Sequence, residues 1–306
     1  MCVKFLPLRR GDGILWLQAM TGPAMAFIFA CLFLGAKIVV SDIMDTQAIP
    51  MLIRRHRVVQ IQATSLFYRM LLSERDITAE DLRGVKYFVN IGTYLPSTTS
   101  DAFQARFGRG ISQIYGLVEA GPVAVNFSED VARRGSIGRA VEGYEIKLAP
   151  THDAPSGGDE TGELLVRGPG LFDGYYSPWQ LRDEVLDDGW LRTGDLARRD
   201  ADGYYWIIGR VKDMINVGGI KVFPSEIEEV IVSHAMVEEA VVFSAPEPRL
   251  GEAPHAKVRL VRGASCSEKD LLQYVNQRLS VFKALRGVEF VEEIPKTVTG
   301  KPRRWA

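Results

Sequence analysis

The sequence predicts an α/β protein, with a parallel sheet in its amino-terminal part and a small α+β unit at its carboxyl end. Three observations support this fold class. Helical and strand patterns alternate through residue 134, a stretch rich in strands and turns follows to residue 211, and a mixed unit begins at residue 212. Because alternating helices and strands build parallel sheets, we expect ligands at the carboxyl ends of the strands.

The first element is an apolar stretch from Ile14 to Val40 that follows several basic residues. By composition alone this stretch could be a signal or a membrane anchor. Its apolar character is broken at five places, namely Gln18, Thr21, Gly22, Pro23 and Lys37. These breaks argue against a membrane anchor, so we expect no membrane span, and a helix over residues 24–34 with a strand over residues 37–40 is the alternative.

Helices and strands then alternate along the chain. The residues from Val58 to Ala63 are β-branched or small and predict a strand, whereas Ile49, Leu52 and Ile53 recur at helical spacing. The same reasoning gives helices over 46–55, 66–72 and 97–107 and strands over 58–63, 85–89 and 111–114. The last strand runs directly into Tyr115, so residues 115–119 occupy a strand end where ligands gather.

Beyond Gly135, short strands are separated by Gly, Asp and Pro. We expect strands over 145–148, 163–166 and 204–208, with a solvated loop over 151–161. In the carboxyl-terminal unit, Ser225 and Glu228 form a capping box for a helix. The other elements expected there are strands over 240–243, 257–261 and 288–291 and a helix over 267–279.

The composition agrees with a soluble enzyme but does not identify one. With 306 residues, of which 46% are hydrophobic and 25% charged, the chain can bury a substantial core. A net charge of -1 gives no electrostatic reason to expect nucleic-acid binding. The three cysteines are far apart and the four histidines lack ligand spacing, which argues against a disulfide framework or a zinc site. We expect a reducing, cytoplasmic setting.

The segment from residue 187 to residue 229 combines acids, bases and glycines at turn positions. It contains Thr193-Gly194-Asp195, then Gly209-Arg210-x-Lys212-Asp213, then Gly218-Gly219-x-Lys221. Such a segment could bind an anion and could also bend. Considered alone, the Gly209–Asp213 part of this segment is better explained as a charged surface loop between a strand and a helix.

Two further motifs stand in order around this segment. They are Ile114-Tyr115-Gly116-Leu117-Val118-Glu119 and Pro295-Lys296-Thr297-Val298-Thr299-Gly300-Lys301. Together the three motifs closely resemble the signature of the AMP-forming acyl-CoA synthetases, which include acyl- and aryl-CoA ligases, adenylation domains and luciferases. The resemblance covers the later part of a complete enzyme, because no Ser/Thr/Gly-rich phosphate loop with a lysine precedes Tyr115.

The resemblance implies a domain division and a set of ligands. Residues 1–134 would be a partial α/β core of the AMP-binding domain, 135–211 its β-rich subdomain, and 212–306 a mobile carboxyl-terminal domain. Within the first part, the resemblance implies that residues 24–34 form a core helix and residues 37–40 a central strand. The implied ligands are ATP or AMP, Mg²⁺ and coenzyme A, together with a carboxylic acid substrate. The pantetheine thiol of a carrier protein is an alternative acceptor to coenzyme A, and a homo-oligomer is an alternative to a monomer.

For the nucleotide, the resemblance implies that Tyr115 stacks on adenine and that Glu119 holds Mg²⁺. Asp195 and Arg210 would meet the ribose, where one carboxylate can accept hydrogen bonds from two hydroxyls. Without the resemblance, we would interpret Tyr115 as a core aromatic residue at a strand end. Asp195 and Arg210 would then be interpreted as a surface ion pair. The other nucleotide-binding candidates are Gly92, Thr93, Gly116 and Val118, the last standing where the family usually has threonine.

Three lysines carry the remaining implied roles. Lys301 would bridge the substrate carboxylate and the α-phosphate during adenylation, although its local sequence is equally that of a basic tail. Lys212 would be the hinge about which the small domain rotates. Lys221 would then lie near the incoming thiol.

The function implied is that of an AMP-forming carboxylic acid:CoA ligase. The acid and ATP would give acyl-AMP and pyrophosphate, and coenzyme A would then give acyl-CoA and AMP, with fatty and aryl acids both open. The missing phosphate loop predicts a truncated ligase whose activity alone is in question. The alternatives are a non-catalytic nucleotide- or acyl-binding remnant, or an interaction module complemented by a separate amino-terminal subunit or carrier protein.

Overall fold

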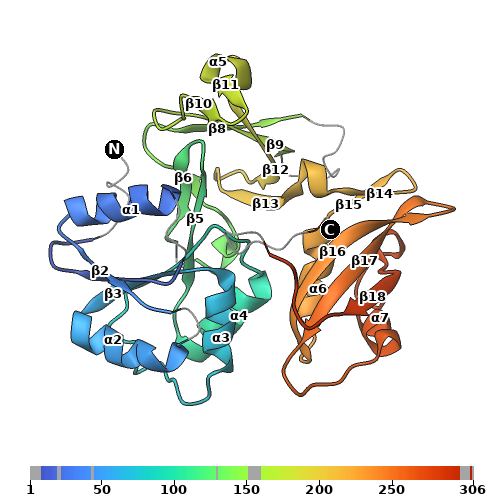
Figure 1. Cartoon of the computed structure of the whole chain (residues 1–306), viewed down its shortest axis with the longest axis horizontal. Helices are drawn as coiled ribbons and strands as arrows, with labels where there is room; N and C mark the ends of the chain where they lie inside the picture. Colours follow the sequence, from blue (N-terminus) through green and yellow to red (C-terminus); the bar gives the residue numbers. More distant parts are fainter. Residues whose placement is uncertain are drawn as a thin grey trace. The chain divides into compact units, whose positions relative to one another are not determined.

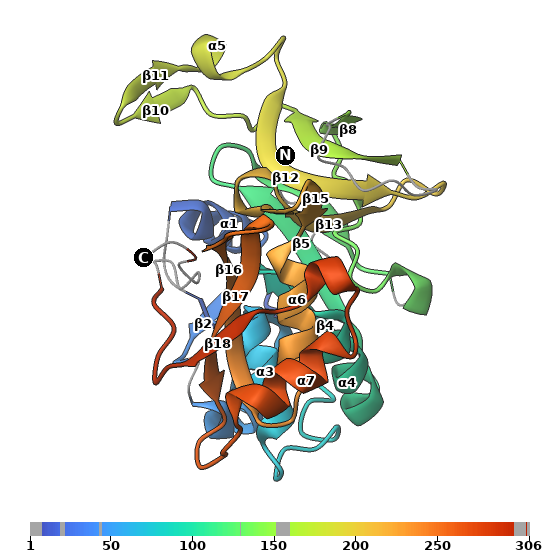
Figure 2. The same cartoon turned by 90° about the vertical axis from the view of Figure 1, so that its right-hand side faces the viewer.

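The computed structural model describes residues 8–18, 22–42, 45–128, 130–150, 160–296 and 304 (Figures 1 and 2). The chain divides into two compact units. The first comprises Met1–Lys147, Leu165–Thr193 and Arg199–Trp206, and the second comprises Leu148–Leu164, Gly194–Arg198 and Ile207–Ala306. The α/β class predicted from the sequence is confirmed, whereas the division at residues 134 and 211 stays a prediction.

A seven-stranded sheet dominates the first unit, in the order β2-β1-β3-β4-β5-β6-β7. Strands β1 to β5 run parallel to one another, whereas β6 is antiparallel to β5 and β7 is antiparallel to β6. The predicted strand over residues 58–63 is confirmed as β3. The strands are β1 Gly13–Trp16, β2 Lys37–Val40, β3 Val58–Ala63, β4 Tyr87–Ile91, β5 Ile111–Leu117, β6 Gly121–Asn126 and β7 Arg139–Ala140.

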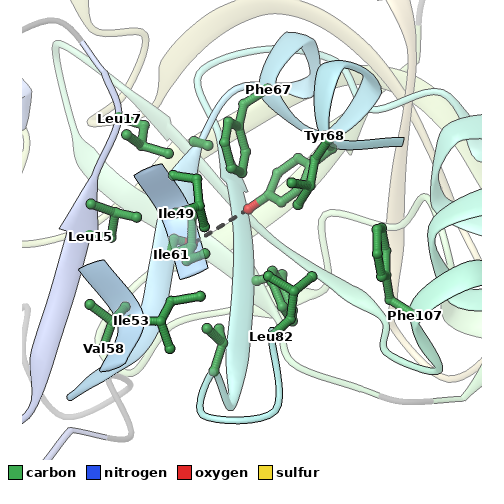
Figure 3. Close-up of a cluster of buried hydrophobic side chains, with 14 of the residues drawn as sticks. Leu15, Leu17, Ile49, Ile53, Val58, Ile61, Phe67, Tyr68, Leu82 and Phe107 are labelled. Atoms are coloured by element: carbon green, nitrogen blue, oxygen red, sulfur yellow. Dashed lines mark hydrogen bonds between the residues drawn. The ribbon is translucent and has the colours of Figure 1, made fainter. Parts of the chain in front are cut away.

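Helices cover both faces of this sheet (Figure 1). Helix α1 packs on the face that carries Ile14 and Trp16, whereas the alternate residues Leu15 and Leu17 face the larger core of α2, α3 and α4. In that core the Tyr68 hydroxyl donates to the carbonyl of Ile61 at 3.4 Å (Figure 3). The helices are α1 Gly22–Phe33, α2 Ile49–His56, α3 Ser65–Ser73 and α4 Ser97–Phe107, with a short 3₁₀ helix at Thr46–Ala48 before α2.

Two predictions for the first apolar stretch were wrong. Strand β2 lies at the edge of the sheet, because the unpredicted strand β1 pairs with both β2 and β3 and takes the interior place. Helix α1 is buried on one side only, since Phe29 is 62% and Phe33 is 84% exposed. Among the described residues, no helix combines the length and apolar character needed to cross a bilayer.

The β-rich region forms a four-stranded sheet and a hairpin. The sheet has the order β13-β12-β9-β8, and the hairpin pairs β10 with β11. Residues 151–159 of the predicted loop lie outside the described residues. The elements are β8 Glu145–Ala149, β9 Glu160–Arg167, β10 Gly174–Tyr176, β11 Trp179–Leu181, α5 Arg182–Val185, β12 Leu191–Arg199 and β13 Tyr205–Arg210, with a 3₁₀ helix at Val131–Arg133 before them.

The remainder of the second unit is an α+β structure. Its sheet has the order β15-β14-β17-β16, with β18 paired to β17, and α6 and α7 share its apolar core. The elements are β14 Ile215–Val217, β15 Ile220–Val222, α6 Pro224–Val232, β16 Val237–Glu247, β17 Gly251–Leu260, α7 Glu268–Asn276 and β18 Gly287–Phe290, with 3₁₀ helices at Val211–Asp213 and Val281–Lys283.

The predicted capping box at the start of α6 is absent. The Ser225 hydroxyl donates to the Ile208 carbonyl at 3.0 Å, and the Glu228 carboxylate accepts from the Val242 amide at 2.8 Å. The helix begins at Pro224. The fixed φ of proline suits the first helical position, and because proline has no amide proton, no capping side chain has to accept one there. Both side chains are therefore available for contacts with neighbouring strands.

Candidate functional site

The Tyr115–Glu119 motif forms the end of β5 and the tight turn into β6. Gly116 is required there, because a Cβ atom would lie 2.5 Å from the carbonyl oxygen of Gly121. Gly121 itself has a φ of 67°, in the left-handed region. Val118 projects from the turn with 76% exposure, and Glu119 is half-buried.

The end of the neighbouring strand β4 brings Gly92 and Thr93 to the same edge. Ile91 pairs with Ile114 in the parallel ladder. Gly92 and Tyr115 each follow one of these two residues, so they lie next to each other at the ends of their strands. Thr93 is held there, since its hydroxyl accepts from the Ser65 amide at 3.1 Å and its carbonyl accepts from Asn90 at 2.7 Å. Four predicted residues, Gly92, Thr93, Tyr115 and Gly116, thus meet at the carboxyl edge of the sheet.

Glu119 has a partner that sequence reasoning missed. The Tyr175 hydroxyl donates to Glu119 Oε1 at 2.9 Å. Burial and the Glu119 carboxylate raise the pKa of Tyr175 to about 12, so the hydroxyl stays a donor at every ordinary pH. The Gly-Tyr-Tyr run at 174–176 is visible in the sequence, but no local pattern indicates a contact across 56 residues.

Glu119 has a chemistry that fits Mg²⁺. Magnesium takes one or two protein carboxylates and completes its shell with phosphate oxygens and waters. In the described ranges no three His, Cys, Asp or Glu side chains gather into a metal cluster. A single carboxylate with one oxygen already held by Tyr175 suits a cation that arrives with a nucleotide.

Asp195 and Arg210 meet in the second unit, on adjacent strands β12 and β13. Arg210 Nε donates to Asp195 Oδ1 at 2.7 Å, and the Asp195 side chain is only 10% exposed. The Gly194 amide donates to the carboxylate of buried Glu163 at 3.2 Å. Glu163 is a second residue whose contribution sequence reasoning missed, although it lies in a Gly-Glu-Leu run. The contact between Asp195 and Arg210 agrees with both interpretations given above, a ribose-binding site and a structural ion pair.

Lys212 and Lys221 also belong to the second unit. Lys212 lies in the 3₁₀ helix Val211–Asp213, directly after β13. Lys221 lies on β15 of an unpredicted hairpin, opposite Asn216, and the turn uses Gly218 and Gly219 at φ values of 59° and 89°. Lys301 lies outside the described residues.

Arg304 is a further residue that the sequence did not single out. Its guanidinium donates to both oxygens of Glu228 and, at 2.8 Å, to the Val242 carbonyl, and it pairs with Asp213 at 3.3 Å. Burial lowers the pKa of Arg304, but the two carboxylates outweigh burial and raise it overall. Before the stretch that contains Lys301, Lys296 pairs with Glu239 at 3.0 Å.

In open α/β sheets, ligands bind at the carboxyl ends of the parallel strands, which is where Gly92, Thr93, Tyr115 and Gly116 lie. Comparison with protein families is more specific. The model described as AMP-binding enzyme matches residues 14–176, and that of the AMP-binding enzyme C-terminal domain matches residues 226–301. The chain therefore belongs to the AMP-binding enzyme family, as its motifs predict.

Curated relatives support this assignment. A long-chain-fatty-acid–CoA ligase of Yersinia pestis is 32% identical over 269 residues, which cover 87% of this chain and 48% of the relative. A medium/long-chain-fatty-acid–CoA ligase, FadD8 of Mycobacterium tuberculosis, is 33% identical over 296 residues, 92% of this chain and 51% of the relative. The chain thus spans about half the length of these relatives.

Solved structures share the fold. The anthranilate CoA ligase AuaEII in complex with anthranoyl-AMP has a TM-score of 0.83 at 29% identity, covering 98% of this chain and 60% of that one. ATP-bound MatB from Rhodopseudomonas palustris has a TM-score of 0.83 at 27% identity, covering 96% of this chain and 59% of that one. These adenylate-forming enzymes confirm the predicted family and fold.

Proposed function

We propose that the chain carries the chemistry of an AMP-forming carboxylic acid:CoA ligase. A carboxylate oxygen attacks the α-phosphorus of ATP, and the bond to the leaving pyrophosphate breaks. The thiolate of coenzyme A then attacks the acyl carbon, and AMP leaves. The observation that carries this proposal is the meeting of Gly92, Thr93, Tyr115 and Gly116 at one sheet edge, with Glu119 in the adjoining turn.

The first unit would bind the adenine and the phosphates. Tyr115 stacks on the base, while Gly92, Thr93 and Gly116 offer backbone groups at the strand ends. Val118 replaces a hydroxyl donor with an apolar side chain, so this turn binds phosphate through its backbone. Glu119 would hold Mg²⁺, which would supply positive charge beside the phosphate oxygens.

The second unit would bind the ribose and supply the lysines. Asp195 accepts from the ribose hydroxyls beside Arg210. Lys301 stabilises charge that develops between the carboxylate and the α-phosphate. Rotation about Lys212 then presents the hairpin with Lys221 to the thiol. The division into residues 1–134, 135–211 and 212–306 belongs to the same proposal.

The substrates follow from the relatives' names. Two of the curated relatives are ligases of long- and medium-chain fatty acids, and a solved neighbour is an anthranilate CoA ligase. We therefore propose an organic acid with an apolar body as substrate and coenzyme A as acceptor. The thiols of Cys31 and Cys266 are unpaired, which agrees with a cytoplasmic setting.

The test is a pyrophosphate-release assay on the full chain with ATP, Mg²⁺ and a panel of fatty and aryl acids. Acid-dependent release, followed by an acyl-CoA product in mass spectrometry, is the expected result. A carrier protein replaces coenzyme A in a second arm. Calorimetric titration with AMP is run beside the assay, and absence of both binding and release contradicts the proposal.

A first prediction concerns Asp195. Replacing it with asparagine is expected to weaken AMP binding by roughly 10- to 100-fold, because hydrogen bonds to a charged group contribute about 1.5–3 kcal/mol. The wild type should prefer AMP over 2′-deoxy- and 3′-deoxy-AMP, and the variant should lose that preference. Calorimetry with the three nucleotides measures both effects.

Asp188→Asn is the matched control for this substitution. Asp188 is exposed, and its φ of 49° is one that asparagine adopts readily. The Asp188→Asn variant should bind AMP with the affinity of the wild type. If Asp195→Asn kept the preference for AMP over both deoxy forms, Asp195 would be a structural ion-pair partner of Arg210 only.

A further inference from the structure

Tyr175 holds the carboxylate of Glu119 from one side. The two residues are 56 positions apart in sequence, and the hydroxyl donates to Oε1 at 2.9 Å. Within the described ranges, no other side-chain hydrogen bond is seen at Glu119. The protein therefore holds Oε1 of the Glu119 carboxylate through Tyr175.

The segment that leads to Tyr175 is bound to the turn that contains Glu119. The Phe172 amide donates to the Glu119 carbonyl at 2.7 Å, and the Tyr144 hydroxyl donates to the Ala120 carbonyl. Gly170 lies so close to this place that a Cβ atom would be 2.9 Å from the Ala120 oxygen. These contacts hold the backbone before Tyr175 close to the backbone at Glu119 and Ala120.

The ring of Tyr175 is also constrained. It meets the ring of Phe172 in an edge-to-face contact, with centroids 4.7 Å apart and an interplanar angle of 66°. Aromatic pairs with this geometry favour one ring orientation. The hydroxyl therefore reaches Glu119 from a preset direction, and the carboxylate loses little further freedom when it binds a cation.

We propose that Tyr175 is a positioning residue for the divalent cation that accompanies the nucleotide, acting by orienting the carboxylate of Glu119. The inference rests on the proposed function. Residues that orient a metal-binding side chain typically contribute 10- to 100-fold to metal affinity. Without the hydroxyl, Glu119 can rotate away from the metal position, whereas the fold keeps its backbone anchors.

The experiment uses the full chain and Mn²⁺ as the spectroscopic substitute for Mg²⁺. Free Mn²⁺ is followed by electron paramagnetic resonance in the presence of a non-hydrolysable ATP analogue. Tyr175→Phe is expected to raise the Mn²⁺ dissociation constant by roughly 10- to 100-fold, in line with the loss of an orienting hydrogen bond. Circular dichroism melting is expected to change little.

Tyr176→Phe is the matched control. Tyr176 lies on the same strand, is 90% exposed and should keep wild-type Mn²⁺ affinity. A double-mutant cycle with Glu119→Gln tests the route of action, because a residue that acts through Glu119 should add nothing once Glu119 is changed.

The outcomes separate this inference from the proposed function. If the wild type binds the Mn²⁺–nucleotide complex and Tyr175→Phe binds it equally well, the inference is overturned and the proposed function stands. An effect of Tyr175→Phe that persists undiminished in Glu119→Gln also overturns it. If the wild type itself binds no complex, both fail together.

Discussion

Replacing Lys301 with alanine is expected to lower the rate of pyrophosphate release by ~10²–10³-fold, because losing one well-placed donor to developing negative charge has this cost. AMP binding should be nearly unchanged, since in the proposed mechanism Lys301 acts on charge that develops only during the reaction. Single-turnover pyrophosphate release measures the first quantity, and calorimetry measures the second.

Lys269→Ala is the control, because Lys269 is an exposed lysine near the start of α7. It should keep the wild-type rate. Lys301→Ala with wild-type pyrophosphate release would show that the motif at the carboxyl end does not serve adenylation. Equal loss of AMP binding and of rate would instead indicate a defect in folding or nucleotide binding.

The largest expected loss of stability is at Phe103. Its side chain is fully buried on α4, with ring centroids 5.5 Å from Tyr68, 5.0 Å from Phe88 and 4.9 Å from Phe107. Phe103→Ala removes this contact surface and leaves a cavity, so we expect a loss of ~3–5 kcal/mol in the free energy of unfolding. Urea unfolding followed by circular dichroism measures the change.

Phe33→Ala provides the comparison, since the same atoms are removed from a side chain that is 84% exposed. Its effect should stay within about 0.5 kcal/mol, as for most surface substitutions. Equal midpoints for the two variants would contradict the description of the α4 face as a close-packed core.

Elements with a strong local pattern could be predicted from the sequence. Residues 58–63 are β-branched or small and form β3 as expected. The order of strands in the sheet is not a local property. Lys37–Val40 has the apolar character of an interior strand, yet Gly13–Trp16 takes that place by pairing with both β2 and β3, and all four of its residues are buried there.

Tertiary contacts overrode other local signals. Ser225 and Glu228 have capping-box spacing, but Ile208 and Val242 bind their side chains. The Gly218-Gly219 pair is a hairpin signal as well as a loop signal, and the structure places it in the turn between β14 and β15. The pairing of Glu119 with Tyr175 depends on two segments that only the fold brings together, so no sequence rule could have found it.

The exposed side of α1 has a practical consequence for handling this protein. Phe29, Leu32 and Phe33 lie on adjacent turns and are each about half exposed or more, next to the edge strand β2. Apolar patches and open strand edges promote self-association, and environment-sensitive dyes bind such surfaces. We expect purified samples to be prone to colloidal aggregation and to give high starting fluorescence in dye-based thermal-shift assays.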